Sequence, residues 1–363
     1  MSDIRDIRPE STGGESGAEP RTRRSVLTSV GTGAAAVTLL TTNATASPKD
    51  EVIRLQGTYS DPVTMAEVQE ARKRVARSTH ASHLKGGADP DYPGNGRMVE
   101  YVVAPRGNGI PRQFVGVAGN PAGVAGVRDR ADEKESTFGR APTAATVGTG
   151  TTFQTTQTGD GWNKIVPGDD EGYYEEPPYG TVQNNFDWWK LDDSKEEDGR
   201  NMHSIRQYHS QIPGRNMDES EYDGSEWQNE YARDKHWWNR GEQTAPELRD
   251  WDPQQEGSGE YSVTLSTSTE PLSWSFPINN TDLHTSTDFT KPTMEVKFQI
   301  WGKQYRRSTM LFDPGSRCEV EEHSCGRYDL LEFRSYAGMQ HAVWGNRNAL
   351  WFDWTLWWDF GNC

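Results

Sequence analysis

Closely spaced carboxylates in the acidic segment 219–230 are the first residues that could carry chemistry. Glu221, Asp223 and Glu226 follow an E-x-D-x-x-E spacing. Side chains on one face of a strand can bring two carboxyl groups to about 5 Å, the separation that retaining glycoside hydrolysis requires. The same segment also approximates a calcium loop, in which Glu219, Glu221 and Asp223 fill positions 1, 3 and 5 and Glu230 fills position 12. A solvated acidic loop without either activity is the third interpretation.

The E-x-D-x-x-E spacing is similar to that of the catalytic strand in one family of β-sandwich glycosidases. The resemblance implies that Glu221 and Glu226 act as nucleophile and acid/base. It covers six residues, and Gly224 and Ser225 stand where that strand carries apolar residues.

The closing segment offers a different chemistry. Trp351 and Trp357 alternate with Asp353 and Asp359 along one side of the predicted strand. Exposed indoles beside carboxylates can hold a sugar ring, because its C–H groups stack on the indoles while its hydroxyls bond to the carboxylates. These four residues are therefore the candidate ligand-binding site, unless the long middle region of the chain covers that face.

Period-2 hydrophobicity predicts the element that positions this site. Large apolar residues share the opposite face of the closing segment: Leu350, Phe352, Trp354, Leu356, Trp358 and Phe360. Similar alternation at 261–265, 272–276 and 296–300 favours a C-terminal antiparallel β-sandwich. The fold class expected is mainly β, with long Trp-rich loops in the sandwich domain and a small α+β region before it.

All 14 tryptophans lie at or beyond Trp162, which suggests four parts in the chain. Residues 1–46 form a signal peptide, 47–118 a small α+β region, 119–150 a Gly/Ala/Thr-rich linker and 151–363 the Trp-rich β-sandwich domain. In the small region, Thr64 and Glu67 make a capping box, which predicts a helix, and strands are expected at 52–55, 98–104 and 113–118.

Three cysteines lie in the last 46 residues. Cys318 and Cys325 enclose a short loop and are expected to form a disulfide, which export would permit, leaving Cys363 free or paired with another chain. A zinc site that includes Cys318, His323 and Cys325 is the less favoured alternative.

Arg23 and Arg24 precede a short, weakly apolar run and an A-x-A cleavage sequence. This arrangement resembles a twin-arginine export signal, which implies passage through the twin-arginine translocation machinery and a secreted or cell-surface location. The run is too short to remain as a membrane span, so none is expected in the mature chain.

The formal net charge of −16 and a hydrophobic fraction of 33% resemble those of exported proteins from salt-loving cells. At high salt the Debye length falls to about 3 Å, which screens the repulsion among carboxylates. Nucleic acid is not an expected partner, because the phosphate backbone repels an acidic chain.

No functional family is recognised in the sequence, and no common catalytic or nucleotide-binding motif occurs in the mature chain. The preferred hypothesis is a secreted or cell-surface, non-enzymatic binding or structural protein that binds a glycan or another surface component. A secreted glycosidase and a processed precursor of an antagonistic polypeptide are the alternatives. No cofactor is expected, apart from Ca²⁺ in the calcium interpretation.

Overall fold

A computed structural model describes residues 52–78, 84–106, 108–139, 161–192, 200–238, 245–254, 259–265, 272–278, 281–321 and 325–360. These residues belong to one compact unit. The export signal, including Arg23 and Arg24, lies outside them, so that prediction stays untested.

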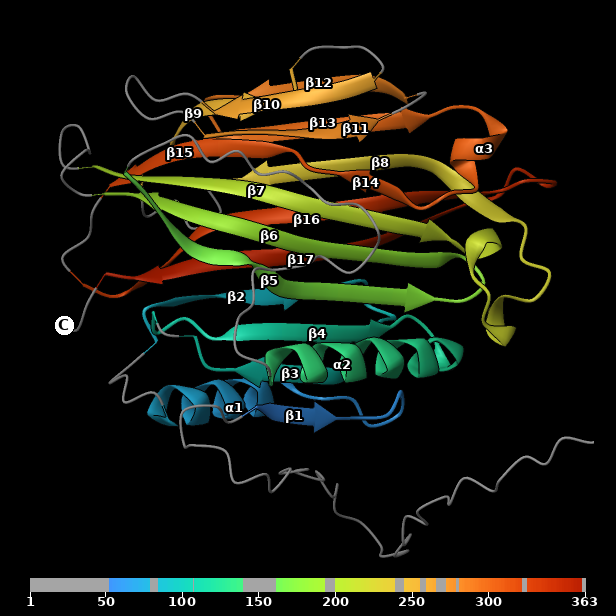
Figure 1. The fold of residues 1–363 in the computed structure, drawn as a ribbon, viewed down its shortest axis with the longest axis horizontal. Helices are drawn as coiled ribbons and strands as arrows, with labels where there is room; N and C mark the ends of the chain where they lie inside the picture. The colour runs from blue at the N-terminus through green and yellow to red at the C-terminus, as the bar shows by residue number, and fades with distance from the viewer. Residues whose placement is uncertain are drawn as a thin grey trace, which may run out of the picture. The chain divides into compact units, whose positions relative to one another are not determined.

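Two large sheets and one hairpin make up the described strands (Figure 1). The first sheet contains, in spatial order, β1 (Ile53–Gln56), β3 (Arg97–Ala104), β4 (Arg112–Ala118), β5 (Trp162–Glu176), β6 (Gly180–Leu191), β7 (Arg200–Pro213), β15 (Gly315–Glu321) and β9 (Glu247–Asp252), and β14 (Met310–Phe312) also pairs with β7. The second contains β12 (Thr281–Asp288), β13 (Thr293–Ile300), β8 (Trp227–Trp237), β16 (Arg327–His341), β17 (Arg347–Asp359) and β2 (Gly86–Asp91). The hairpin pairs β10 (Gly259–Leu265) with β11 (Leu272–Ile278).

The two sheets pack face to face through β5 and β6 on one side and β16 and β17 on the other. The Phe186 ring of β6 lies 5.0 Å from Phe333 of β16 and 5.9 Å from Trp354 of β17. Asn184 donates to the carbonyl of Phe352, and the indole of Trp354 donates back to the carbonyl of Asn184, both at 3.0 Å. The mainly β, sandwich-like fold expected from the sequence is therefore confirmed.

Part of the interface between the sheets is polar. Gln207 of β7 donates to Ser335 of β16 at 2.7 Å and accepts from His236 of β8 at 2.8 Å, and all three side chains are buried. Nearby, His209 and Asp234 lie 2.8 Å apart and are also fully buried. Burial lowers the pKa of His236 to about 3, so that its ring is neutral.

The N-terminal region forms the elements predicted for it but is not a separate domain. Helix α1 (Met65–Ser78) begins with the expected capping box, in which the Thr64 N–H donates to Glu67 at 2.8 Å. β4 pairs in parallel with β5, and β2 pairs with β17 in the second sheet. The region 47–118 therefore contributes strands to both sheets of the sandwich.

The predicted linker 119–150 is corrected at its N-terminal half. Residues 121–123 form the 3-10 helix η1 (Pro121–Gly123), and α2 (Val124–Phe138) follows it, with Val127, Ala131 and Phe138 buried. The charged residues 128–135 favour a short helix within the linker, but the weak apolar period hid its full length, because ion pairs as well as apolar contacts hold it to the sheet. Arg130 binds the buried Glu171 of β5 at 2.6 Å, and Lys134 binds it at 2.5 Å.

The middle of the chain also differs from expectation, because its tryptophans lie on strands rather than in long loops. Trp162 is on β5, Trp188 and Trp189 are on β6, and Trp251 is on β9, and all four are buried. Polar residues between them point to the interface and to neighbouring strands, which obscures a period-2 pattern.

Gly172 of β5 lies against Phe352 of the facing sheet, and it generates a first prediction. A Cβ at this position would lie 2.1 Å from the ring of Phe352. Gly172→Ala should therefore lower the free energy of unfolding by about 1–3 kcal/mol, measured by chemical denaturation. Gly94→Ala is the matched control, since a Cβ there meets nothing within 4 Å. Equal losses in the two variants would contradict the packing described.

Glu171 generates a prediction about pH. Burial alone would raise its pKa, but the charges of Lys134 and Arg130 lower the pKa of Glu171 to about 2. A depressed carboxyl pKa stabilises the fold above the ordinary value near 4.5 and loses that contribution as the pH falls toward 2. Glu171→Gln should lose about 3 kcal/mol at neutral pH, and its difference from the wild type should shrink between pH 4.5 and 2 in denaturation series. A difference that stays constant over this range would refute the assignment.

Candidate functional site

The closing strand β17 has the predicted inner face, but its other face is largely covered too. Leu350, Phe352, Trp354 and Leu356 are buried as expected. On the opposite face Asp353 is 0% exposed and Trp357 is 4% exposed, and only Trp351 and Asp359 are half-buried. The predicted ligand site of Trp351, Asp353, Trp357 and Asp359 is therefore not an open platform, and that prediction is corrected.

An arginine side chain of the protein itself lies against the indole ring of each of the two tryptophans. The guanidinium of Arg334 lies 4.3 Å from the ring centre of Trp351 and forms an ion pair with Asp353. The guanidinium of Arg327 lies 4.1 Å from the ring centre of Trp357. Burial raises the pKa of Asp353 to about 8, with the charge of Arg334 acting in the opposite direction. Both indoles therefore carry a cation where a sugar ring would stack.

Strand β2 explains why Trp357 is buried. This strand pairs with β17, and its two glycines pass directly over the tryptophans. A Cβ on Gly87 would lie 2.9 Å from the ring of Trp357, and one on Gly86 would lie 3.0 Å from Trp358. Only glycine therefore lets the backbone of β2 approach this closely.

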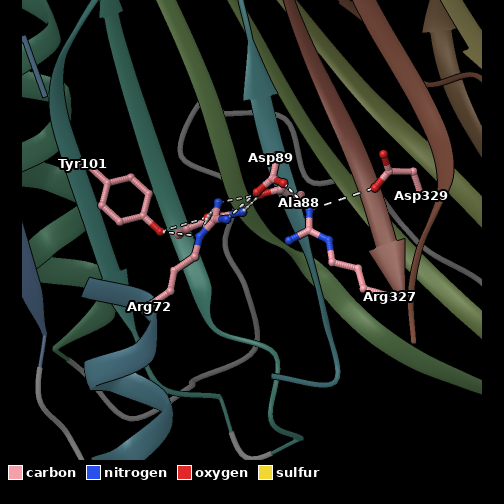
Figure 2. Close-up of polar contacts among 7 residues, drawn as sticks. Arg72, Ala88, Asp89, Tyr101, Arg327 and Asp329 are labelled. Carbon is pink, nitrogen blue, oxygen red and sulfur yellow. Dashed lines mark hydrogen bonds and ion pairs between the residues drawn. The ribbon is translucent and has the colours of Figure 1, made fainter. Parts of the chain in front are cut away.

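Asp89 connects strand β2, which covers Trp357, to the N-terminal helix α1 (Figure 2). Its carboxylate binds Arg72 of α1 on one side and Arg327 of β16, at 2.5 Å, on the other. Arg72 is 4% exposed and also donates to the carbonyl of Ala88 at 2.6 Å and to the hydroxyl of Tyr101 at 3.0 Å. Burial on its own would raise the pKa of Asp89, but the charges of Arg72 and Arg327 hold that pKa below its ordinary value. This cluster is a structural joint between α1, β2 and β16.

Glu221, Asp223 and Glu226 of the acidic segment do not lie on a strand. Glu221 lies on the 3-10 turn η4 (Ser220–Tyr222), which precedes β8, and both Glu221 and Asp223 are exposed. Glu226 forms an ion pair with Arg215, beside the turn η3 (Gly214–Asn216). The catalytic strand expected for Glu221, Asp223 and Glu226 is therefore not formed.

The calcium interpretation meets a similar obstacle. Glu219 is exposed, whereas Glu230 is nearly buried on β8 and binds Arg347 at 2.7 Å. Over the ranges that the structure describes, no group of three His, Cys, Asp or Glu side chains is placed to hold a metal ion. The ligand set of Glu219, Glu221, Asp223 and Glu230 is thus not brought together.

The predicted disulfide between Cys318 and Cys325 is wrong. Cys318 lies on β15 as a free, fully buried thiol, and burial raises its pKa well above the ordinary value. The residue is part of the hydrophobic core. Cys363 and His323 lie outside the described residues.

The outer face of the second sheet carries a group of cationic and aromatic side chains that was not predicted from the sequence. The strand registers place one residue from each of β13, β8, β16 and β17 side by side in a row across the sheet. One row consists of Lys297, Arg233, Tyr336 and Trp351, and the next of Glu295, Lys235, Arg334 and Asp353. We call these two rows, together with Tyr231 and Trp237, the outer aromatic face.

Each ring of the outer aromatic face lies against a cation. Arg233 is 4.0 Å from the ring centre of Tyr336, Lys297 is 4.6 Å from that of Tyr231, and Lys235 is 5.6 Å from that of Trp237. Trp351 carries Arg334, as described above. Every one of these rings and cations is partly exposed. The face thus offers a surface of cations supported by aromatic rings.

The sequence shows no clear period-2 pattern that would reveal this face. From Tyr231 to Trp237 the odd residues of β8 face outward, while its even positions include the buried Asp234 and His236. A strand that buries charged residues does not display the apolar alternation on which period-2 reasoning depends.

Comparisons with known proteins leave the family open. No protein-family model and no curated protein matches the chain. Among solved structures, the chain is similar to "Clostridium perfringens delta-toxin", with a TM-score of 0.32 and 9% identity over 56% of this chain and 84% of that chain. It is also similar to a structure titled "Pore forming protein", with a TM-score of 0.29 and 5% identity over 54% of this chain and 90% of that chain. Likenesses at these scores assign no activity.

No helix in the described part of the chain is long and apolar enough to cross a membrane. This finding concerns the described residues alone.

The joint at Asp89 generates a prediction. Asp89→Asn should lower the free energy of unfolding by about 3 kcal/mol, because it removes the charge that pairs with the buried Arg72. Asp329→Asn is the matched control, since Asp329 is 42% exposed and lies 4.0 Å from Arg327 (Figure 2). The control should change stability by less than about 0.5 kcal/mol in the same denaturation experiment. If the two variants prove equally stable, Asp89 is not the joint.

Proposed function

We propose that the protein is an exported, non-enzymatic binding protein whose outer aromatic face takes an acidic glycan of a cell surface. The observation that carries this proposal is the cation that lies against each ring of the face. Because those cations cover the positions where neutral sugars stack, a ligand must be recognised chiefly by its negative charges.

The composition of the face supports an anionic ligand. Lys235 and Lys297 form no ion pair with a carboxylate among the described residues, and each is held over a ring. Asp353 is buried against Arg334, which leaves Glu295 and Glu332 as the half-buried carboxylates nearby. The face therefore carries four cations against the three carboxylates of Glu295, Glu332 and Asp353, an excess of one positive charge on a chain whose formal net charge is −16.

The geometry suits an extended chain of sugars. Neighbouring strands lie about 4.8 Å apart, so a row across four strands measures about 14 Å. A polymer with repeated carboxylates or sulfates could contact Lys297, Arg233 and Arg334 in succession. Hydroxyl groups of the same polymer could bond to Glu295 and Glu332.

The two other functions receive less support. A glycosidase would need the two glutamates close together, whereas Glu221 is exposed on a turn and Glu226 is paired with Arg215. A released C-terminal polypeptide would have to separate β4 from β5 and β2 from β17 after cleavage. Neither is proposed here.

Titration calorimetry of the mature chain with alginate, a carboxylated polysaccharide, tests the proposal. The double variant Arg233→Gln with Lys297→Gln should bind alginate about tenfold more weakly, because it removes two charge-assisted contacts. Neutral dextran should bind far more weakly than alginate, and added salt should weaken the alginate complex.

The matched control is Lys73→Gln with Arg77→Gln, which removes the same charge from the exposed side of α1. This variant should bind alginate as the wild type does. Equal binding of alginate and dextran, or equal losses in the two double variants, would reject the proposal. Single-stranded DNA that binds as tightly as alginate would also reject it, because the face would then select charge and not a glycan.

A further inference from the structure

The cysteines of the chain are Cys318, Cys325 and Cys363. Of the two that the structure describes, only Cys318 is a free thiol, and it is fully buried in the core. Cys325 lies two residues before β16 and is half-buried. Because Cys318 is excluded as its partner, Cys363 is the only other cysteine of the chain with which Cys325 could form a bond.

The pairing of β16 with β17 brings the end of the chain back to Cys325. At the open end of this hairpin Arg327 lies opposite Asp359, and the N–H of Phe360 donates to the carbonyl of Gly326 at 3.0 Å. One further step of the same antiparallel register would place residue 361 opposite Cys325. Cys363 follows two residues later, and two residues span at most about 7 Å. The Cα separation of about 4.4–6.8 Å that a disulfide requires is therefore within reach.

The last described residues are fixed in this position by non-covalent contacts. The ring of Phe360 packs edge-on against Tyr328 with 5.8 Å between ring centres, and the N–H of Asp359 donates to the carbonyl of Lys85 at 2.9 Å. These contacts anchor the chain three residues before Cys363, which raises the effective concentration of its thiol at Cys325. The intervening residues are Gly and Asn, both favoured in tight turns.

From this geometry we infer that Cys325 and Cys363 form an intramolecular disulfide that fastens the open end of the β16–β17 hairpin. The Sγ–Sγ bond forms as two S–H bonds break, and two protons and two electrons pass to an oxidant. Molecular oxygen, which is reduced to hydrogen peroxide, balances this step, as does the disulfide of a thiol oxidoreductase, which is reduced to a dithiol. This inference is independent of the glycan proposed for the outer aromatic face.

The bond would stabilise the closing hairpin as a whole. It closes a loop that contains all of β16 and β17, and a long closed loop restricts the unfolded chain more than the short loop between Cys318 and Cys325 would. The fastened end is also continuous with the core, because Trp358 lies 5.6 Å from Trp188 and 6.2 Å from His203 between ring centres. Loss of the bond should therefore lower the thermal stability of the whole chain.

Thiol counting with Ellman's reagent tests the inference on the mature chain, purified without reductant and then unfolded in guanidinium chloride. The wild type should show one thiol per chain, because Cys318 alone is reduced. Cys318→Ala should show none, and Cys363→Ser should show two. Digestion of the wild type with trypsin and a protease that cleaves after Glu should release the peptide of Cys325 joined to the C-terminal peptide, and reductant should separate the two.

Thermal unfolding shows whether the bond fastens the hairpin. Reduction should lower the Tm of the wild type by about 5 °C and leave the Tm of Cys363→Ser unchanged. Cys318→Ala is the matched control, since it removes the other thiol and should still lose about 5 °C on reduction. The thiol count is made on unfolded chains, so it holds even for a variant that folds poorly.

Three thiols in the wild type would overturn the inference, and so would the absence of the joined peptides. A wild type that runs as a disulfide-linked dimer on a non-reducing gel would show that the bond joins two chains and would overturn it as well. An unchanged Tm on reduction of the wild type would refute the fastening of the hairpin.

Discussion

The sandwich depends on the paired charges of Arg72, Asp89 and Arg327. An arginine that is 4% exposed requires a negative partner, and Asp89 is the carboxylate that meets it. The same carboxylate binds Arg327, which lies on Trp357 of the closing strand. One aspartate on a six-residue strand thus connects the first helix to the last two strands. If β2 lay elsewhere, Trp357 would be exposed, as the ligand site predicted from the sequence requires.

The sequence predicted what depends on local chemistry or on a clean apolar period. The capping box at Thr64 and the inner face of β17 are of this kind, and both are present. It failed where tertiary contacts override local preference. The segment Gly-Gly-Ala-Asp-Pro-Asp has no strand propensity, and it becomes β2 because it fits between Arg72 and Trp357. The packing of helix α2 on the sheet was hidden for a related reason, since Glu171 holds it from a strand about 40 residues away.

The candidate site was harder to predict than the fold, because exposure cannot be deduced from a strand pattern. Trp351 and Trp357 stand six residues apart on the same face, yet only Trp351 reaches solvent. The difference comes from β2, which is more than 250 residues distant in the chain. The polar contacts between the sheets had the same effect on β8. Asp234 and His236 form hydrogen bonds with His209, Gln207 and Ser316 inside the sandwich, and the strand that buries them therefore shows no apolar alternation that would mark its outward cations.

The strands donated by the N-terminal region have a consequence for solubility. At the edge formed by the N-terminal region, each large sheet ends in a strand that is poorly suited to pair with a strand of another molecule. β1 is four residues long, and β2 contains Pro90, which has no N–H to donate, between two aspartates. Without the strands β1 to β4, the terminal strands would be β5 and β17, which are 15 and 13 residues long and rich in aromatic residues. The strands of residues 53–118 therefore act as a cover against aggregation, which matters most in concentrated salt, where charge repulsion between molecules is weak.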